Sequence, residues 1–165
     1  MTSHEYVLDA MRRTGRAAAE ALQAAAPQLT GTEINARSGY LPSFDPAKQY
    51  RDYQAGYVCR SKQGRAVRMI QPYDSVTYPQ EPEELPAQWG YYWSTDPAMA
   101  LPFIQSANSP YNTGDCCTHA GRVWRSGMDG NVHAPDSVGA EWEDLGPVGA
   151  VSKSDALEER RDDHE

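Results

Sequence analysis

An internal repeat is the feature that most constrains the fold of this chain. In each copy a Tyr-x-x-Gly-x-x-Cys stretch is followed by a Gly-Arg pair and, later, by a tryptophan. The first copy has Tyr53, Gly56, Cys59, Gly64, Arg65 and Trp89, and the second has Tyr111, Gly114, Cys117, Gly121, Arg122 and Trp142. The Tyr, Gly and Cys positions are offset by 58 residues and the Gly-Arg pair by 57, so one loop differs by a single residue. Such self-similarity predicts two copies of one small structural unit.

Each copy has the pattern of a small antiparallel β-meander. The cysteine lies on a short strand, and the glycine of the Gly-Arg pair ends a hairpin loop in which a positive φ is accessible to it. The next strand is expected over residues 65–70 in the first copy and 122–126 in the second, and a proline-bearing loop then leads to the tryptophan. A unit of about forty residues buries little apolar surface by itself. We therefore expect it to depend on aromatic residues and on a neighbour.

Aliphatic residues are scarce, and this favours aromatic cores. Only 22 of the 165 residues are Leu, Ile, Val or Phe, which is below the share of roughly 20% under which a chain begins to resemble a disordered one. Tyr and Trp add 14 residues, which concentrate in the repeats. We expect Trp89, Trp124 and Trp142 to lie in the cores, because so small a unit needs its largest apolar side chains inside.

The first thirty residues have a helical pattern instead. Thr2 and Glu5 form a capping box, and Pro27 ends the helix or follows its end. The apolar stripe is narrow and made largely of alanine, which leaves two interpretations open. The stripe permits close approach of a second helix, as in a short oligomeric stalk, or the helix packs on its own domain through Leu22 and Tyr6. A short second helix is expected to begin at Thr30 or Thr32.

The predicted fold class is therefore α+β, with an N-terminal α-helical segment followed by two small antiparallel β-sheet modules. The expected domains are a helical segment over 1–39, a first module over 40–93 and a second module over 94–148. Residues 149–165 are expected to form a charged, disordered tail, because they are rich in charge and have almost nothing to bury.

Charge and hydropathy exclude several kinds of partner. The net charge of −8 argues against a nucleic-acid binder, which needs clustered Lys and Arg, and against an anionic membrane surface. No apolar run is long enough to insert in a membrane. Glu5 and Asp9 stand where a signal peptide needs a basic and then an apolar region, so we expect synthesis in the cytoplasm without a signal peptide.

Catalytic and metal sites are not expected. Cys59 and Cys117 occupy matching places in the copies and are interpreted as small buried hydrophobes. Cys116, Cys117 and His119 do not have the two spaced ligand pairs of a structural zinc site, and a Cys117–His119 nucleophile pair would lack an oxyanion site. Pairing Asp115 with Asp129 or Glu141 as a glycosidase is less convincing than Asp115 as a turn cap. We expect a protein that is not an enzyme and has no cofactor.

The second copy resembles a known kind of module. Its Tyr111, Gly114, Asp115, the run Gly121-Arg-Val-Trp-Arg-Ser126, then Asn131-Val132, Pro135 and Trp142, are similar to the chitin-binding-type carbohydrate-binding modules of families 5 and 12. The layout over residues 5–145, helix, bridge, module, spacer, module, resembles small tandem-module proteins of bacteriophages and prophages of Gram-positive bacteria. The chain departs from the family pattern at His133, where members carry an aromatic residue, at Tyr57, which replaces the Asp of the other copy, and at residues 136–141, where a glycine-rich turn is usual.

The resemblance implies sugar binding by flat aromatic faces with polar groups nearby. The candidate residues are Tyr73 and Tyr78 in the loop that follows the first hairpin, and Asn131 and His133 in the matching loop of the second copy. The aromatic run from Trp89 to Trp93 is expected to form a contact between modules or chains.

The expected function is that of a virion tail protein that binds host cell-wall polysaccharide without catalysis. Its partners would be that polysaccharide, other phage structural proteins and copies of itself through the N-terminal helix. Two alternatives stay open. One is a purely structural virion component whose modules pack neighbouring subunits, and the other is an accessory module for a separate hydrolase.

Overall fold

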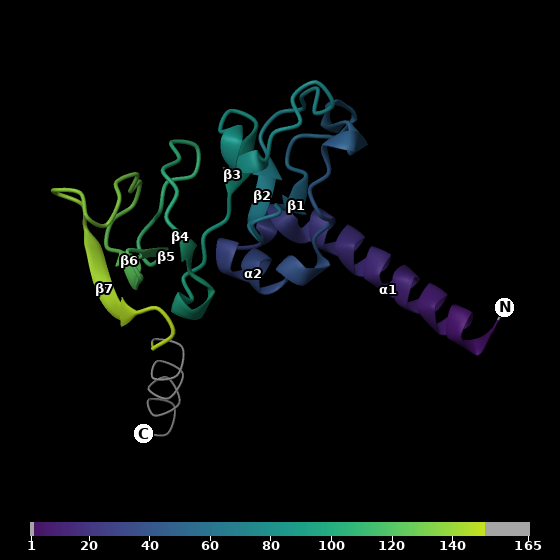
Figure 1. Cartoon of the computed structure of the whole chain (residues 1–165), viewed down its shortest axis with the longest axis horizontal. Helices are drawn as coiled ribbons and strands as arrows, with labels where there is room; N and C mark the ends of the chain where they lie inside the picture. Colours follow the sequence, from purple (N-terminus) through teal and green to yellow (C-terminus); the bar gives the residue numbers. More distant parts are fainter. Residues whose placement is uncertain (1, 151–165) are drawn as a thin grey trace. The chain divides into compact units, whose positions relative to one another are not determined.

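The structure, a computed structural model, describes residues 2–150. The chain divides between Tyr92 and Trp93 into two compact units, unit 1 and unit 2. Helices and a three-stranded sheet make up unit 1, and a four-stranded sheet makes up unit 2, so the expected α+β class is confirmed (Figure 1). Of the tail predicted over 149–165, all but residues 149 and 150 lie outside the described residues.

Unit 1 begins with helix α1, Ser3–Ala25, and helix α2, Gly31–Ala36, which follows a short 3₁₀ turn at Pro27. Both helices start with the same device. The Thr2 hydroxyl accepts from the Glu5 N–H and the Glu5 carboxylate accepts from the Thr2 N–H, and Thr30 and Glu33 repeat this pattern. These capping boxes satisfy N–H groups that have no partner inside a helix. The predicted cap at Thr2 and the predicted second helix are confirmed.

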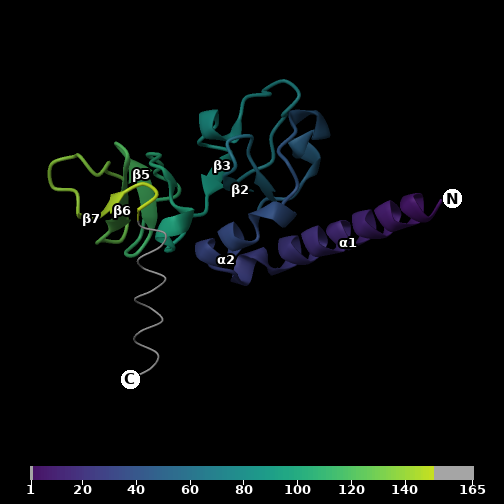
Figure 2. The same cartoon turned by 60° about the horizontal axis from the view of Figure 1, so that its bottom comes forward.

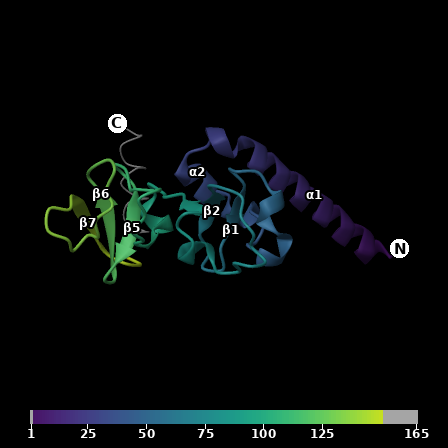
Figure 3. The ribbon, with the colours of Figure 1, turned by 90° about the horizontal axis from the view of Figure 1, so that it is seen from above.

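The sheet of unit 1 consists of β1, Val58–Arg60, β2, Ala66–Met69, and β3, Trp89–Tyr91, all antiparallel in the order β1-β2-β3. Both helices lie along the same side of it (Figures 1 and 3). They share one apolar core with the sheet and with the segment that leads to it, formed by Leu22, Ala26, Ile34, Leu41, Val58 and Ala66. The helices therefore share the core of the first sheet and belong with it to unit 1.

Helix α1 is attached to unit 1 only near its C-terminal end. The Gln23 side chain accepts a hydrogen bond from the Val58 N–H and donates one to the Val58 carbonyl, which fixes the last turns of α1 to β1. The first turns extend away from the sheet and the shorter helix (Figures 1 and 2), and Tyr6 is 62% exposed. One interpretation of the sequence is that α1 packs on its own domain through Leu22 and Tyr6. Leu22 does so, but Tyr6 does not.

Unit 2 contains four strands in the order β4-β5-β6-β7: β4, Leu101–Pro102, β5, Cys116–His119, β6, Arg122–Ser126, and β7, Trp142–Pro147. The last three form the expected antiparallel meander, and β4 adds to its edge in parallel with β5. In the part of the chain that the structure describes, no helix is both long enough and apolar enough to span a membrane.

The predicted repeat is visible in the backbone of the two units. Cys59 pairs with Val67, and Cys117 pairs with Trp124, at the same offsets as in the sequence. The turn that precedes each first strand is closed alike, because the Gly56 N–H donates to the Met69 carbonyl and the Gly114 N–H donates to the Ser126 carbonyl, both over 2.8 Å. These glycines have φ values of 95° and 96°, a region that other residues rarely adopt.

The closing tryptophans also occupy matching positions. Trp89 pairs with Met69, the last residue of β2, and Trp142 pairs with Ser126, the last residue of β6. Trp89 is fully buried as predicted, whereas Trp142 and Trp124 are only half-buried. The two units are therefore two versions of one module, and the first version is the better enclosed.

The repeat extends further upstream than the sequence indicates. In each unit a residue upstream of the meander pairs in parallel with the first strand of that meander. Ser43 pairs with Arg60 of β1, and Pro102 pairs with Thr118 of β5. The next residue is a phenylalanine in both units, and its N–H donates to the carbonyl of Arg60 in unit 1 and of Thr118 in unit 2. Phe44 and Phe103 are therefore equivalent, although their local sequences differ.

One predicted equivalence is wrong. Tyr53 matches Tyr111 in spacing, but Tyr50 takes the structural place of Tyr111. The Tyr50 ring is fully buried, stacks on Phe44 with centroids 5.6 Å apart and meets Trp89 edge-on at 5.4 Å. The Tyr111 ring, 1% exposed, makes the same two contacts with Phe103 at 5.4 Å and Trp142 at 5.2 Å. Each module thus has a Phe-Tyr-Trp core.

Candidate functional site

Tyr73 belongs to the aromatic core of unit 1 more than to its surface. Its hydroxyl accepts a hydrogen bond of 2.9 Å from the Trp89 indole N–H, and its ring stacks on Tyr50 with centroids 6.2 Å apart. The side chain is half-buried, and burial raises the pKa of its phenol. A tyrosine held in this way supports the fold and presents only part of its ring to a ligand.

Tyr78 is the exposed aromatic side chain of the same loop, with 56% of its surface accessible. The loop is held by Asp74, whose carboxylate accepts from the Gln49 amide at 2.8 Å and from the Thr77 hydroxyl at 2.7 Å. These hydrogen bonds, that from Gln49 first, lower the pKa of Asp74 to about 2. The Tyr78 N–H in turn donates to the Asp74 carbonyl over 3.0 Å. Tyr78 is therefore carried by an ordered loop.

Asn131 has a structural role in unit 2. Its backbone exchanges two hydrogen bonds with Tyr111, and its amide nitrogen donates to the Ser126 hydroxyl over 3.2 Å. The residue is 0% exposed, so it has no surface with which to contact a sugar. The prediction of direct ligand contact at Asn131 is therefore corrected, because its side chain and backbone are used for hydrogen bonds inside the module.

His133 lies in the same loop and is exposed. Its N–H donates to the Asn131 side chain over 3.2 Å, and its carbonyl accepts from the Trp142 indole N–H over 2.9 Å. The backbone of His133 is thus fixed while the imidazole remains accessible. Of the four predicted site residues, the structure leaves Tyr78 of unit 1 and His133 of unit 2 open to solvent, and each belongs to its own unit.

The aromatic run from Trp89 to Trp93 serves the interior of the units. Tyr91 is 7% exposed on β3. Trp93 stacks on Tyr111 with ring centroids 4.1 Å apart and planes 12° apart, and its indole N–H donates to the Ser109 carbonyl over 2.8 Å. These contacts within single units account for the apolar character of the run.

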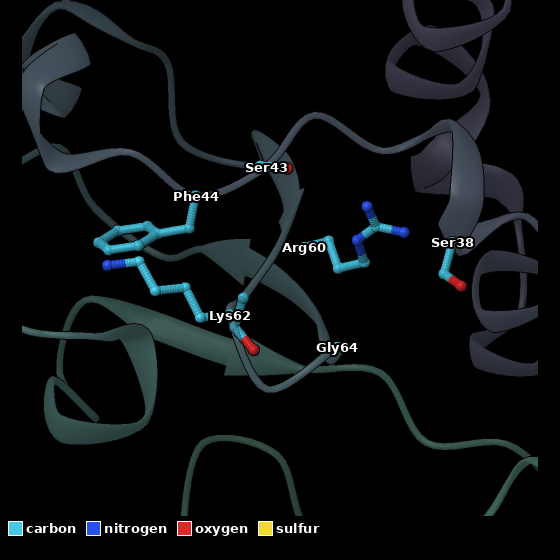
Figure 4. A pocket seen from close by; sticks show the side chains of 7 residues that line it. Ser38, Ser43, Phe44, Arg60, Lys62 and Gly64 are labelled. Atoms are coloured by element: carbon cyan, nitrogen blue, oxygen red, sulfur yellow. The ribbon is translucent and has the colours of Figure 1, made fainter.

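A polar pocket in unit 1 was not predicted. It encloses about 430 Å³ and is lined by Ser38, Ser43, Phe44, Arg60, Ser61, Lys62 and Gly64. Figure 4 shows the Lys62 side chain beside the Phe44 ring and the Arg60 guanidinium on the other side, directed toward Ser38. Its volume is within the range of roughly 300–1,000 Å³ typical of small-molecule sites. A signal was present in the sequence, because Arg60 and Lys62 have no basic counterpart in the second copy.

The cysteines and carboxylates considered for catalysis lie in different surroundings, and burial first, then the charge of Asp129, raise the pKa of Asp115. Cys59, Cys116 and Cys117 are buried, and burial raises the pKa of the Cys59 thiol to about 12. Asp115 accepts from the Asn112 N–H over 2.8 Å and so closes the turn that contains Gly114, rather than the one expected after it. Within residues 2–150, no three His, Cys, Asp or Glu side chains are grouped closely enough to hold a metal ion.

Comparisons with models of protein families, with curated proteins and with solved structures gave no significant match.

Proposed function

We propose that this protein binds polysaccharide of the host cell wall without catalysis and that it is associated with a bacteriophage tail. The observation that carries the proposal is the same small β module built twice, with matching strand register and a matching Phe-Tyr-Trp core. The sequence of the second copy resembles carbohydrate-binding modules of families 5 and 12, and tandem modules of this kind suit a repetitive polymer. Two weak sites gain avidity where the geometry lets both engage.

Tyr78 is the residue on which we centre the binding surface of unit 1. An exposed ring offers a flat apolar face for a pyranose, and an ordered loop presents that face without a further loss of conformational entropy on binding. The side chains that hold the loop, Asp74 and Thr77, are polar and belong to the same short segment as Tyr78. Loss of the ring is expected to weaken binding without loss of the fold.

The test is retention of the purified protein on Gram-positive cell walls and on insoluble polysaccharides. Tyr78→Ala is expected to reduce retention severalfold while the melting temperature stays within about 2 °C, since a surface substitution costs little stability. Tyr40→Ala is the matched control, because it removes a tyrosine of similar exposure, 58%, from outside that loop. Retention that is absent for the wild type, or equal in both variants, would count against the proposal.

A second function is favoured by the exposed start of α1. Tyr6 and Met11 are 62% and 65% exposed, and Val7 is 53% exposed between them. Apolar side chains on a projecting helix suit contact with another subunit, as in a structural virion component or an oligomeric stalk. Under this hypothesis a chain shortened by residues 1–14 has a smaller solution mass than the full chain, and an unchanged number of subunits argues against it.

A further inference from the structure

The pocket beside β1 has a chemistry that the fold of unit 1 does not explain. Arg60 is half-buried as a residue, and its guanidinium makes no hydrogen bond or ion pair with any other residue in 2–150. The hydroxyls of Ser38 and Ser43, which also line the pocket, likewise have no hydrogen-bond partner in the described part of the chain. A guanidinium without a protein partner keeps all five of its N–H donors available. Its unused donors point to a ligand that carries negative charge.

The second module works as an internal control for the role of Arg60. Arg60 pairs with Ala66 at the end of β1, and Thr118 pairs with Val123 at the matching place on β5. Thr118 therefore satisfies the same strand register without a charge. Phe44, in contrast, is repeated as Phe103. Phe44 is therefore part of what both modules share. Arg60 is not, and the module fold does not require it.

Positive charge is concentrated at this pocket although the chain is acidic. The sequence has three lysines, and two of them are here: Lys62 lines the pocket, and the Lys48 ammonium lies 3.5 Å from the carbonyl of Ser43. Glu81 opposes this charge, because its carboxylate lies 3.2 Å from the Lys62 ammonium. The Lys62 side chain is 72% exposed, so this pair is weak and open to exchange. Among the described residues, no carboxylate forms an ion pair with Arg60.

We infer that the pocket formed by Arg60, Lys62, Ser38 and Ser43 binds a carboxylate or phosphate group carried on a glycan. The planar Arg60 guanidinium matches either group with two parallel hydrogen bonds, and the serine hydroxyls are free to orient neighbouring sugar hydroxyls. The Lys62 ammonium, on the other side of the pocket, adds a second positive charge that attracts the acidic sugar (Figure 4). Phe44 supplies an apolar wall beside the Lys62 side chain. The site is therefore selective for an acidic sugar residue over a neutral one.

The choice of a glycan as the carrier rests on the proposed function, whereas the anion site does not. A nucleic acid also carries phosphates, but its binding needs a row of cations along the backbone. The pocket offers two cations, and the chain has a net charge of −8. Two cations on an acidic protein are better suited to a single acidic group on an otherwise uncharged or sparsely charged polymer.

The experiment measures the affinity of the full chain for four soluble probes by calorimetry. The probes are a trisaccharide with one glucuronate for the carboxylate, a trisaccharide with one phosphate ester for the phosphate, a neutral chitin trisaccharide and an oligothymidylate of three nucleotides. The test variant is R60T/K62Q, in which Arg60 receives the residue that module 2 uses. The control is R12Q/R68Q, which removes two exposed arginines and lowers the net charge equally.

We expect one or both acidic glycan probes to bind and R60T/K62Q to weaken that binding by about tenfold or more, since charge-assisted hydrogen bonds are lost. R12Q/R68Q should change it by less than about twofold, because exposed charges at a distance are screened. Glu81→Gln should tighten it, since the carboxylate that competes for Lys62 is removed.

Equal weakening in both double variants would show only a general charge effect and overturn the inference, as would absence of binding to both acidic glycans. Binding of the oligothymidylate through the same two residues, as tight as that of the acidic glycans, would overturn the choice of carrier. Wall retention that persists without any acidic-probe binding would refute this site and leave the proposed function standing. Acidic-probe binding without wall retention would refute the proposed function and leave this site standing.

Discussion

At the scale of single residues, the two core tyrosines show how the module closes. The Tyr50 hydroxyl accepts from the Asp45 N–H over 2.9 Å, and the Tyr111 hydroxyl accepts from the Ile104 N–H over 3.3 Å. In each unit this N–H belongs to the residue after the core phenylalanine. The tyrosine hydroxyl therefore fixes the segment that follows the core phenylalanine to the aromatic core. No strand pairing within residues 2–150 holds these two parts of the chain together.

Tyr50→Phe is expected to lower the free energy of unfolding by about 1–3 kcal/mol, because a part-buried N–H loses its partner. Tyr111→Phe should cost less, since its hydrogen bond is longer. Chemical denaturation followed by tryptophan fluorescence measures both. Tyr78→Phe is the control, and the exposed position of its hydroxyl leads us to expect no change. Equal stability of Tyr50→Phe and the wild type would show that water replaces the lost partner.

Asp74 makes the loop of Tyr78 sensitive to acid. Its pKa in the folded protein is about 2, below the ordinary value of 3.8, so its hydrogen bonds stabilise the fold above about pH 4. This contribution is lost as the pH falls through about 2. We therefore expect Asp74→Asn to lower the melting temperature at pH 7 and to differ little from the wild type below pH 2. A difference that does not depend on pH would contradict the assignment.

At the scale of elements, the two capping boxes are chemically alike but differ in what their helices support. The α2 helix carries Ile34, which is fully buried, whereas the first turns of α1 are exposed. A cap contributes to global stability only where the helix it starts is part of the cooperative core.

Thr30→Ala should therefore lower the free energy of unfolding of unit 1 by about 1 kcal/mol, the usual cost of losing an N-cap hydroxyl. Thr2→Ala removes the same group from the same kind of box and should leave that free energy unchanged, while it frays the start of α1. Hydrogen exchange of the β1 and β2 amides reports the first effect, and exchange of the first α1 amides reports the second. The reverse order of effects would mean that α1 is cooperative over its whole length.

The spacing of the repeat correctly predicted the two antiparallel meanders, but not β4. Turn glycines and short strands are determined by residues close together in the chain, and for this reason Gly56 and Gly114 could be recognised directly. A parallel edge strand such as Leu101–Pro102 has no pattern of its own. It forms because β5 presents an unpaired edge, and the sequence of two residues does not indicate this.

At the scale of the whole molecule, the helical segment and the first module form one folding unit. Leu22 and Ala26 are each 4% exposed in the core of unit 1, and Gln23 satisfies both backbone groups of Val58. A chain lacking residues 1–14 keeps all three residues, whereas a chain lacking residues 1–29 keeps none.

We expect the shorter deletion to preserve the protected amides of β1–β3 and the longer one to abolish them, because cavities at Leu22 and Ala26 and an unpaired Val58 would be created together. Amide exchange measured by NMR distinguishes these outcomes residue by residue. The amides of β5–β7 in unit 2 provide the control within each sample. Persisting protection of β1–β3 after the longer deletion would show that the sheet folds without the helix.

The candidate site was less predictable than the fold. A loop with Tyr73 and Tyr78 is evident in the sequence, but which ring faces water depends on Trp89 and Tyr50, which approach from other segments. The pocket around Arg60 could not be predicted for the same reason. Ser38 lies in a 3₁₀ turn, Ser43 in an isolated β-bridge and Lys62 in the turn after β1, so three separate segments converge on it. Sequence spacing carries no information on such convergence.

The sequence alone determined that one module occurs twice, where its turns fall and where both helices begin, because these features follow from backbone preferences and hydrogen bonds between near neighbours. Only the tertiary structure decided that Tyr50 and not Tyr53 enters the core, that Asn131 is buried, and that Arg60 is left with unused donors. Each of these depends on which distant segments compete for the same space, and burial is settled by that competition.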